Sequence, residues 1–477
     1  MMTKSINIKK KSKFLILLVL SVLVLPVICL SANISEPISF FGIRIEFILF
    51  ALVLIGVALF HNQTFWVALI GLAVILTYKL IFDPMFNTFE HFFGKDYSFM
   101  QQLLEKDIRQ GEWSILVNLL GLLLGFALLA RIFEESGVPE AISKYLPSDW
   151  KAPFILLIFV MVLSSFLDNI AAAMIGGAIA LVVFNKKVHI GYIAAIVAAS
   201  NAGGAGSVVG DTTTTMMWID NVSELNVLHA FIASIVAILF FGWFASHQQH
   251  KYQHIIHRYH ERHKISWRKI IVVVSVFIGA ILGNIFFNMP AAGVWIALLI
   301  ALAYTKMPWE ELSHALKGSI FLLCLVTCAS MMPVETLPAP SWVTAFILGF
   351  VSAVFNNIPL TKLCLDQGHF DWGMLAYTVG FGGSMIWFGS SAGVAITNEF
   401  PEARNVFLWI KNGWHVTVAY VLGFFVLLFL MGWNPTSNSK HTEPVKNCKD
   451  KNCQVAAKDK VQLNNSRKGN KLQLKIQ

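Results

Sequence analysis

Long apolar stretches separated by short polar connections run through most of the chain. Uninterrupted apolar stretches lie at about 41–60, 63–82, 113–133, 226–246, 270–287, 290–306, 318–333 and 405–432. Most are long enough to cross a hydrocarbon core of about 30 Å as a helix. The pattern predicts an all-α polytopic membrane protein with about 10–11 transmembrane helices.

Four further apolar stretches are interrupted in their middle. They lie at 152–184, 191–219, 341–366 and 372–399. Asp168-Asn169 divides the first into halves too short to span, which predicts a re-entrant hairpin with the Asp-Asn pair at its tip. The second is interrupted by SNAGGAGSVVGDTTTT at 200–215, which predicts a broken helix.

The two halves of the chain share these features in the same order. VLSSFLDNIA (162–171) aligns with FVSAVFNNIP (350–359), and Gly203-Gly204-x5-Gly210-Asp211-Thr212 aligns with Gly382-Gly383-x5-Gly389-Ser390-Ser391. Each half is expected to hold three spans, a re-entrant hairpin, a broken helix and a final span. Because that makes an odd number of crossings, the second repeat should be inverted, an architecture typical of transporters.

Charge divides the chain and orients it. Only 13% of residues are charged and 56% are hydrophobic, which excludes a soluble protein. The net charge of +9 is concentrated in the N-terminus, a central loop and the tail. This distribution reflects the orientation of a protein in an inner membrane, with lipids as its surroundings, and excludes nucleic acid as a partner. The expected segments are 1–40 (signal-like or a first transmembrane segment), 41–246 (first repeat), 247–269 (basic, His-rich cytoplasmic loop), 270–433 (second repeat) and 434–477 (disordered basic tail). Repeat symmetry puts this tail in the periplasm despite its lysines.

Carboxylates at bilayer depth mark functional sites, because they are costly unless paired or solvated. Asp168 and Asp211 lie at the first hairpin tip and the first helix break, among hydroxyl and amide oxygens that suit Na⁺, Li⁺ or H⁺. The candidate ion-binding and coupling set is Asp168, Asn169, Asn201, Asp211, Thr212, Thr213, Asn356, Asn357, Thr361, Ser384, Ser390 and Ser391. The alternative for both aspartates is capping of broken helix ends. The glycines either allow close packing or supply unwound backbone, and the site favours the latter.

Two other features leave alternatives open. Lys362 either compensates charge near the site or snorkels to an interface. His247, His250, His254 and His257 would form one stripe if the helix that leaves the membrane at 246 continued. That stripe could serve as a pH sensor, a basic helix on anionic lipid, or a shared metal site. The absence of a phosphate-binding glycine loop argues against an ATPase; neither an enzyme, a resident cofactor nor a structural metal is expected.

Four segments resemble the NhaD-type sodium/proton antiporters of the Ion Transporter superfamily, which also holds arsenite permeases and citrate carriers. They are SSFLDNIAAAMIGG (164–177), NAGGAGSVVGDTTTTMMWI (201–219), NNIPLTK (356–362) and GGSMIWFGSSAGVA (382–395). The resemblance implies a scaffold and a transport domain, elevator-like alternating access, and Na⁺ or Li⁺ expelled for H⁺, by a monomer or a homodimer. The family's coupling residues would fall on Asp168, Asn169, Asp211, Thr212 and Ser390.

One position departs from the family, and rival functions stay open. NhaD-type proteins generally carry Asp-Asn in the second hairpin, where this chain has Asn356-Asn357, so its stoichiometry should differ. A sodium-coupled carboxylate symporter on the same fold is the main rival, favoured only by Lys362. A membrane sensor or structural protein, favoured by the His-rich loop, would not explain two matched polar breaks.

Overall fold

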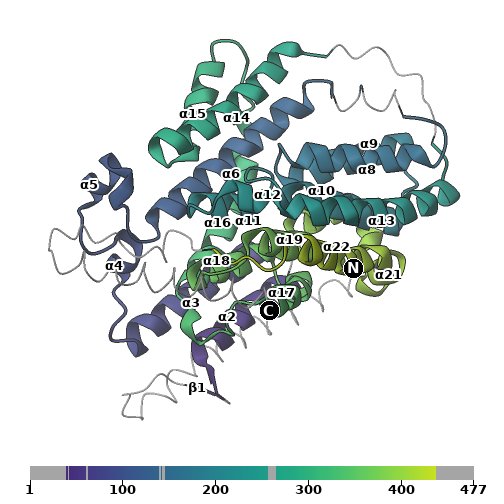
Figure 1. The fold of residues 1–477 in the computed structure, drawn as a ribbon. Coiled ribbons are helices and arrows are strands. Elements are labelled where there is room, and N and C mark those ends of the chain that lie inside the picture. Colours follow the sequence, from purple (N-terminus) through teal and green to yellow (C-terminus); the bar gives the residue numbers. More distant parts are fainter. Residues whose placement is uncertain are drawn as a thin grey trace, which may run out of the picture. The chain divides into compact units, whose positions relative to one another are not determined.

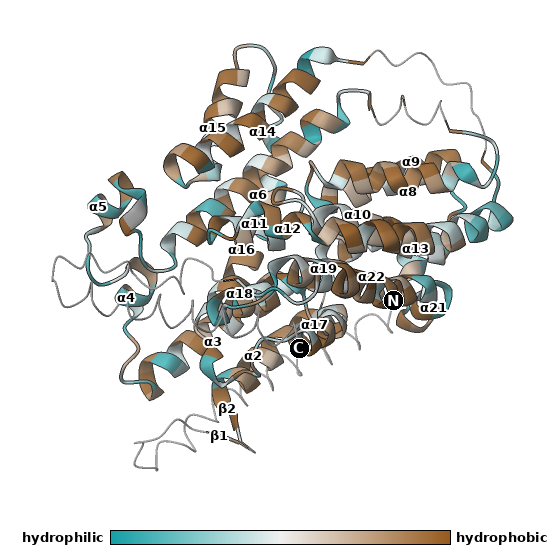
Figure 2. Ribbon diagram, in the orientation of Figure 1, coloured by the Kyte–Doolittle hydropathy of each residue, from teal (hydrophilic) through white to brown (hydrophobic). Residues whose placement is uncertain are grey.

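The computed structural model describes residues 39–40, 42–60, 63–138, 141, 146–255 and 265–436. Most of the signal-like segment and the tail from 437 lie outside these ranges. Regular structure in the described part is helical, apart from a short antiparallel pair of strands, β1 (Ser39–Phe40) and β2 (Ile43–Arg44). Figure 2 shows that apolar residues cover the long helices and polar residues gather at their ends.

Six helical segments of the described chain are long and apolar enough to cross a membrane. They are α3 (Thr64–Phe82), α6 (Trp113–Glu134), α12 with α13 (Glu224–Tyr252), α14 (Trp267–Phe287), α16 (Glu310–Ser330) and α22 (Trp414–Met431). On α14, Ile271, Ile278 and Ile285 point outward at seven-residue spacing and are 63%, 52% and 59% exposed. A stripe of exposed isoleucines suits contact with lipid, so the protein is a multi-pass membrane protein, as predicted.

All four predicted interruptions are present. The interrupted pairs are α8 (Lys151–Ser164) and α9 (Asn169–Val183), α10 (Ile190–Ala205) and α11 (Thr212–Ile219), α17 (Trp342–Val354) and α18 (Asn357–Gln367), and α19 (Trp372–Gly382) and α20 (Ser391–Glu399), with the 3-10 turn η3 (Gly383–Met385) in the last break. Helices α8 and α9 pack against each other, as do α17 and α18. Asp or Asn begins the second helix of each hairpin pair as an N-cap, which explains why the chain resumes a helix there.

The glycines at the breaks pack closely, and the prediction that they supply unwound backbone is wrong for the first break. Helix α10 continues through Gly203 and Gly204, so only 206–211 is non-helical. A Cβ at Gly203 would lie 2.0 Å from the Met161 carbonyl oxygen, and one at Gly210 would lie 2.1 Å from that of Ser164. The hairpin tip therefore lies directly against the break, at a distance that only glycine allows.

The second half repeats these contacts at the aligned positions. A Cβ at Gly382 would lie 2.5 Å from the Gly349 carbonyl oxygen, and one at Gly389 would lie 2.9 Å from that of Ser352. In each half, a hairpin tip lies against the following helix break through a pair of glycines. The sequence alignment thus corresponds to the same local packing.

Two predicted boundaries differ from the structure. The span at 405–432 is divided at Gly413 into α21 (Val406–Asn412) and α22, because the Gly413 amide closes a turn onto the Trp409 carbonyl while the Trp409 indole is buried against Ser384. The loop at 247–269 is shorter, since α13 (Ala230–Tyr252) covers its start and α14 covers its end. Its residues 256–264 lie outside the described ranges.

The helices fall into two packed groups (Figure 1). The first, here the frame group, consists of α2 (Ile45–Leu59), α3, α6, α14, α15 (Pro290–Ala301) and α16. The second, here the core group, consists of α8 to α13 and α17 to α22, with α13 against α22 and α10 against α19. The two groups meet where α11 packs on α6 and α18 packs on α16.

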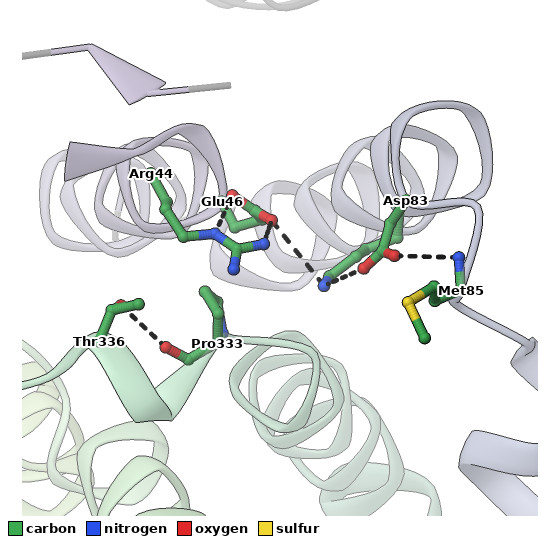
Figure 3. A network of polar contacts seen from close by, with 7 residues as sticks. Arg44, Glu46, Asp83, Met85, Pro333 and Thr336 are labelled. Carbon is green, nitrogen blue, oxygen red and sulfur yellow. Dashed lines mark hydrogen bonds and ion pairs between the residues drawn. The ribbon is translucent and has the colours of Figure 1, made fainter. Parts of the chain in front are cut away.

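The ends of α6 identify two sides of the molecule. On the side where α6 begins, here the Glu112 face, Arg109 donates to the carbonyls of Phe287 and Asn288 at the end of α14. The Glu112 amide donates to the His91 carbonyl, and the His91 ring contacts Ser330 at the end of α16, so the end of α16 lies on this face. Figure 3 shows Arg44 and Glu46 at the start of α2 and Asp83 at the end of α3, near Pro333 and Thr336, which follow α16. Lys79 bridges the two helices, with its ammonium 2.9 Å from Asp83 and 3.9 Å from Glu46.

On the side where α6 ends, here the Glu134 face, the chain enters α14. Lys269 pairs with Glu135 at 2.7 Å, and the Ser266 amide donates to the Ser136 carbonyl. Helix α2 therefore begins at the Glu112 face, whereas α14, its counterpart in the alignment of the two halves, begins at the Glu134 face.

Candidate functional site

Each of the four breaks resumes its helix under a polar N-cap. Asp168 accepts from the Ile170 amide at 3.1 Å, Asp211 from Thr213 at 3.4 Å, Asn356 from Ile358 at 3.0 Å and Ser390 from Gly393 at 3.2 Å. The capping role weighed for the aspartates is therefore present. It does not use all the lone pairs of either carboxylate, which leaves acceptor capacity for a further ligand.

Buried amides connect the two halves beside the breaks. Asn169 donates to Asn201 at 3.1 Å, and Asn201 donates to the Ser384 hydroxyl at 2.9 Å. Asn357 points its amide at the second oxygen of Asp211, at 3.5 Å. Asn169 and Asn357 are the first residues of the second helix in their hairpins. Asn357 contacts the other half directly, and Asn169 is linked to it through Asn201.

A cavity of about 780 Å³ lies between the frame group and the core group, bounded by α6 and α16 on one side and by α9 and α20 on the other. Five candidate residues line it: Asp168, Asp211, Thr212, Asn356 and Ser391. The other candidates are buried behind this wall: Asn169, Asn201, Thr213, Asn357, Thr361, Ser384 and Ser390. Thr361 uses its hydroxyl within its own helix, donating to the Asn357 carbonyl.

The far end of the cavity is acidic. Glu134 and Glu311 line it at the Glu134 face, and Glu399 at the end of α20 adds a third carboxylate. Arg131 also lines it, but pairs with Glu134 at 2.6 Å and with Glu135 at 3.1 Å. Carboxylates therefore outnumber guanidinium and ammonium groups along the described wall, which favours a cation over an anion inside.

Ser164 is a candidate ligand that the sequence did not distinguish from its neighbours. Its hydroxyl is fully buried at the hairpin tip and has no hydrogen-bond partner among the described residues, whereas the aligned Ser352 donates to the Val379 carbonyl. A buried hydroxyl without a partner is uncommon, and an ion ligand would satisfy it. The asymmetry between aligned serines is visible only in three dimensions.

Lys362 does not snorkel, and it does not compensate the aspartates of the cavity. It is fully buried on α18, with its ammonium 2.7 Å from Glu112 and 2.8 Å from Asp366. It is also absent from the cavity wall. The i, i+4 spacing of Lys362 and Asp366 was a signal for the second partner, whereas Glu112 lies 250 residues away in the chain.

The predicted histidine stripe does not form along one helix. Helix α13 ends at Tyr252, and Gln253 is extended, so His254 lies beyond the helix although its ring contacts that of His250 at 4.3 Å. His247 stacks on Trp150 at 4.5 Å, and His257 lies outside the described residues. No group of three His, Cys, Asp or Glu in the described ranges is arranged to hold a metal.

Membrane-crossing helices, matched helix breaks and a cavity with carboxylates between two helix groups define a secondary transporter rather than an enzyme. A family model described as citrate transporter matches residues 6–380, and the chain belongs to this family. It is similar to the Na⁺/H⁺ antiporter NhaD of Vibrio cholerae, with 25% identity over 331 residues that cover 56% of the chain and 68% of that protein. It is also similar to NhaD of Alkalimonas amylolytica, with 32% identity over 88 residues, 18% of each chain. The resemblance seen in the sequence is thus confirmed.

Proposed function

We propose that the protein exchanges Na⁺ or Li⁺ for H⁺ across the inner membrane. The observation that carries the proposal is that Asp168 and Asp211 line one cavity whose one arginine is already paired. A carboxylate in such a site binds either a cation or a proton, and competition between the two couples their movement. The names of the two NhaD relatives support the same exchange.

The ligand set we propose lies around the first hairpin and the first break. Asp211 is only 2% exposed and would hold the ion, with Thr212 and the Ser164 hydroxyl as further oxygen ligands. Asp168 is more open and would receive the cation or proton from the cavity. Hard oxygen ligands of this kind suit Na⁺ and Li⁺.

We further propose that the two halves are inverted repeats that work by alternating access. Support comes from the opposite directions of α2 and α14 and from the matched glycine contacts at both hairpin tips. A two-fold axis would also pair each contact between the halves with a second, equivalent contact. Helix α3 of the first half packs on α16 of the second, as α15 of the second packs on α6 of the first. In the same way, α9 packs on α20, and α18 packs on α11. An elevator movement would shift the core group along α6 and α16. The homodimer remains a prediction.

The cavity would face the cytoplasm. Lys186 and Lys187 follow the end of α9, Arg404 follows α20 in a short 3-10 helix, and Lys411 lies in the last turn of α21, as expected for the cytoplasmic side. The cavity also reaches Glu134 and Glu311, at the face where the basic loop of 253–266 enters α14. We therefore assign the Glu134 face to the cytoplasm and the Glu112 face to the periplasm.

A sodium-coupled carboxylate carrier is the second candidate, favoured by the description of the matching family and by the size of the cavity. A dianion would need an unpaired cationic side chain or a bound sodium ion to offset the acids of the wall. Lys362, the one feature of the sequence that favoured this carrier, is buried against Glu112 and Asp366 instead. The charges therefore favour cation exchange.

The test compares three Asp→Asn variants in everted vesicles, with a pH-sensitive dye reporting Na⁺-driven proton movement. Asparagine can still cap a helix, so each variant should fold. Asp168→Asn and Asp211→Asn should abolish exchange, because each removes a titratable ligand from the cavity. Asp371→Asn is the matched control, since Asp371 caps α19 outside the cavity wall and should leave exchange intact. Wild-type exchange in the first two variants would refute the site, and citrate-dependent sodium uptake in proteoliposomes would favour the carboxylate carrier.

A further inference from the structure

The contact between the frame group and the core group differs at the two faces. Near the Glu134 face, the cavity opens between α6 and α16 on one side and α9 and α20 on the other, although α6 also contacts α9. Near the Glu112 face, α11 packs on α6 and α18 packs on α16, so the two groups are in contact there. We name this second contact the Glu112 seam.

A buried ion pair crosses the Glu112 seam. Glu112 belongs to the frame group at the start of α6 and is 5% exposed, whereas Lys362 belongs to the core group and is fully buried. Their charged atoms lie 2.7 Å apart. Because both charges are buried, separating them without a substitute partner would be strongly unfavourable.

The aligned positions of the first hairpin carry no charges. Aligned positions of the two hairpins differ by 188 residues, as Asp168 and Asn356 do (356 − 168 = 188). Met174 therefore aligns with Lys362, and Ala178 aligns with Asp366. Both Met174 and Ala178 line the open cavity. The repeat therefore provides an ionic contact for closing one seam and an apolar surface for closing the other.

We propose that the Lys362–Glu112 pair is a latch that holds the Glu112 seam closed and biases the transporter toward the state with the cavity open at the Glu134 face. The inference rests on the alternating access proposed above. Asp366 lies 2.8 Å from Lys362 on the same helix. When the core group moves, Lys362 leaves Glu112 and keeps Asp366 as its counter-ion, so its ammonium is never buried alone.

Accessibility of one cysteine on each hairpin measures the latch directly. Leu363→Cys reports on the Glu112 seam, because Leu363 is 8% exposed and packs in one cluster with Leu325 and Cys328 of α16. Ile175→Cys is its counterpart in the alignment and lines the cavity. Each is placed in a chain whose native cysteines are replaced by alanine, and the rate of labelling by a membrane-impermeant maleimide is followed in vesicles of both orientations.

Glu112→Gln removes the negative charge from the contact across the seam and keeps the pair of Lys362 with Asp366. It should raise the labelling rate at position 363 from the Glu112 face at least fivefold and lower the rate at 175. Asp366→Asn is the matched control: it removes the partner within α18, keeps the seam pair, and should leave position 363 protected. The exchanged pair Glu112→Lys with Lys362→Glu, combined with Asp366→Asn so that two carboxylates do not face each other on α18, should restore protection toward the wild-type rate.

Unchanged labelling at 363 in Glu112→Gln would overturn the latch, as would equal labelling in Glu112→Gln and Asp366→Asn. Labelling needs no sodium flux, so it separates the latch from the proposed exchange. If Asp211→Asn abolishes exchange while Glu112→Gln still exposes position 363 in that background, both proposals stand. If the wild type exchanges no Na⁺ but Glu112→Gln still exposes position 363, the ion assignment fails and the latch stands.

Discussion

Substitution of Gly203 by alanine tests the close approach on which the first break depends. The added Cβ would lie 2.0 Å from the Met161 carbonyl oxygen, where an ordinary contact begins at 3.4 Å, so 1.4 Å of separation is missing. That oxygen cannot move freely, because it accepts from both the amide and the hydroxyl of Ser165. Overpacking of this kind typically costs about 1–3 kcal/mol.

Gly318→Ala is the matched control on α16. Gly318 lines the cavity, and a Cβ there would meet nothing within 4 Å. In a helix, alanine is favoured over glycine by about 1 kcal/mol, so this variant should be as stable as wild type or more so. Both glycines lie inside helices, so the gain in helix propensity is common to the two variants, and the predicted difference between them is the overpacking cost of about 1–3 kcal/mol.

The difference is measured as the fraction of folded protein that remains after heating in detergent, by size-exclusion chromatography with fluorescence detection. Gly203→Ala should melt several degrees lower than wild type and lose exchange, because the hairpin tip with Asp168 must shift. Gly382→Ala should behave similarly, since its Cβ would lie 2.5 Å from the Gly349 carbonyl oxygen. A Gly203→Ala protein as stable as Gly318→Ala would refute the packing argument.

Three further outcomes are expected. Asn356→Asp adds a carboxylate to the cavity wall and should change the number of protons exchanged or the pH profile of exchange. The proton number is measured from the voltage dependence of exchange in proteoliposomes. If neither quantity changes, residue 356 has only a structural role. Alkaline phosphatase fused after Thr436 should be active, because Thr436 forms hydrogen bonds with Phe370 and Trp372 at the end assigned to the periplasm. Activity of a cytoplasmic reporter alone at this position would mean that the assignment of the two faces is reversed. The hydrogen bond from Lys269 lowers the pKa of Glu135, so this pair stabilises the fold at neutral pH, and that stability is lost as the pH falls through the lowered pKa of Glu135. Lys269→Met should therefore cost less than about 1 kcal/mol at pH 7, as both groups are partly exposed, and less in acid; a difference in melting temperature that does not shrink as the pH falls would contradict the assignment.

The sequence predicted the four helix breaks because their signals are local. Asp168-Asn169 and Asn356-Asn357 place polar caps inside apolar stretches, and a helix that begins at depth needs such a cap. The extent of the first break could not be predicted, because Gly203 tolerates both a helix and unwound backbone. Its state is decided by the Met161 carbonyl, which packs against it.

The partners of the buried lysine could not be predicted from local pattern alone. Lys362 lies in an interrupted apolar stretch, so the sequence left both snorkelling and charge compensation open, and no local pattern points from it to Glu112. Only tertiary packing joins positions 250 residues apart. The histidine stripe failed for the opposite reason: the spacing was local, but the helix needed to display it ends at Tyr252.

The interlocking of the halves has a consequence for how the chain is made. Asp211 meets Asn357, and Asn201 meets Ser384, so polar groups of the first half find partners in a half that is synthesised later. Until then, α9 and α11 lack α20 and α18 beside them. The newly inserted first half thus holds Asp211 and Asn201 in the bilayer without their partners from the second half, which is costly at that depth. Insertion of the second half completes the packing of the first, and a chain truncated before α17 should be recognised as unfinished and degraded.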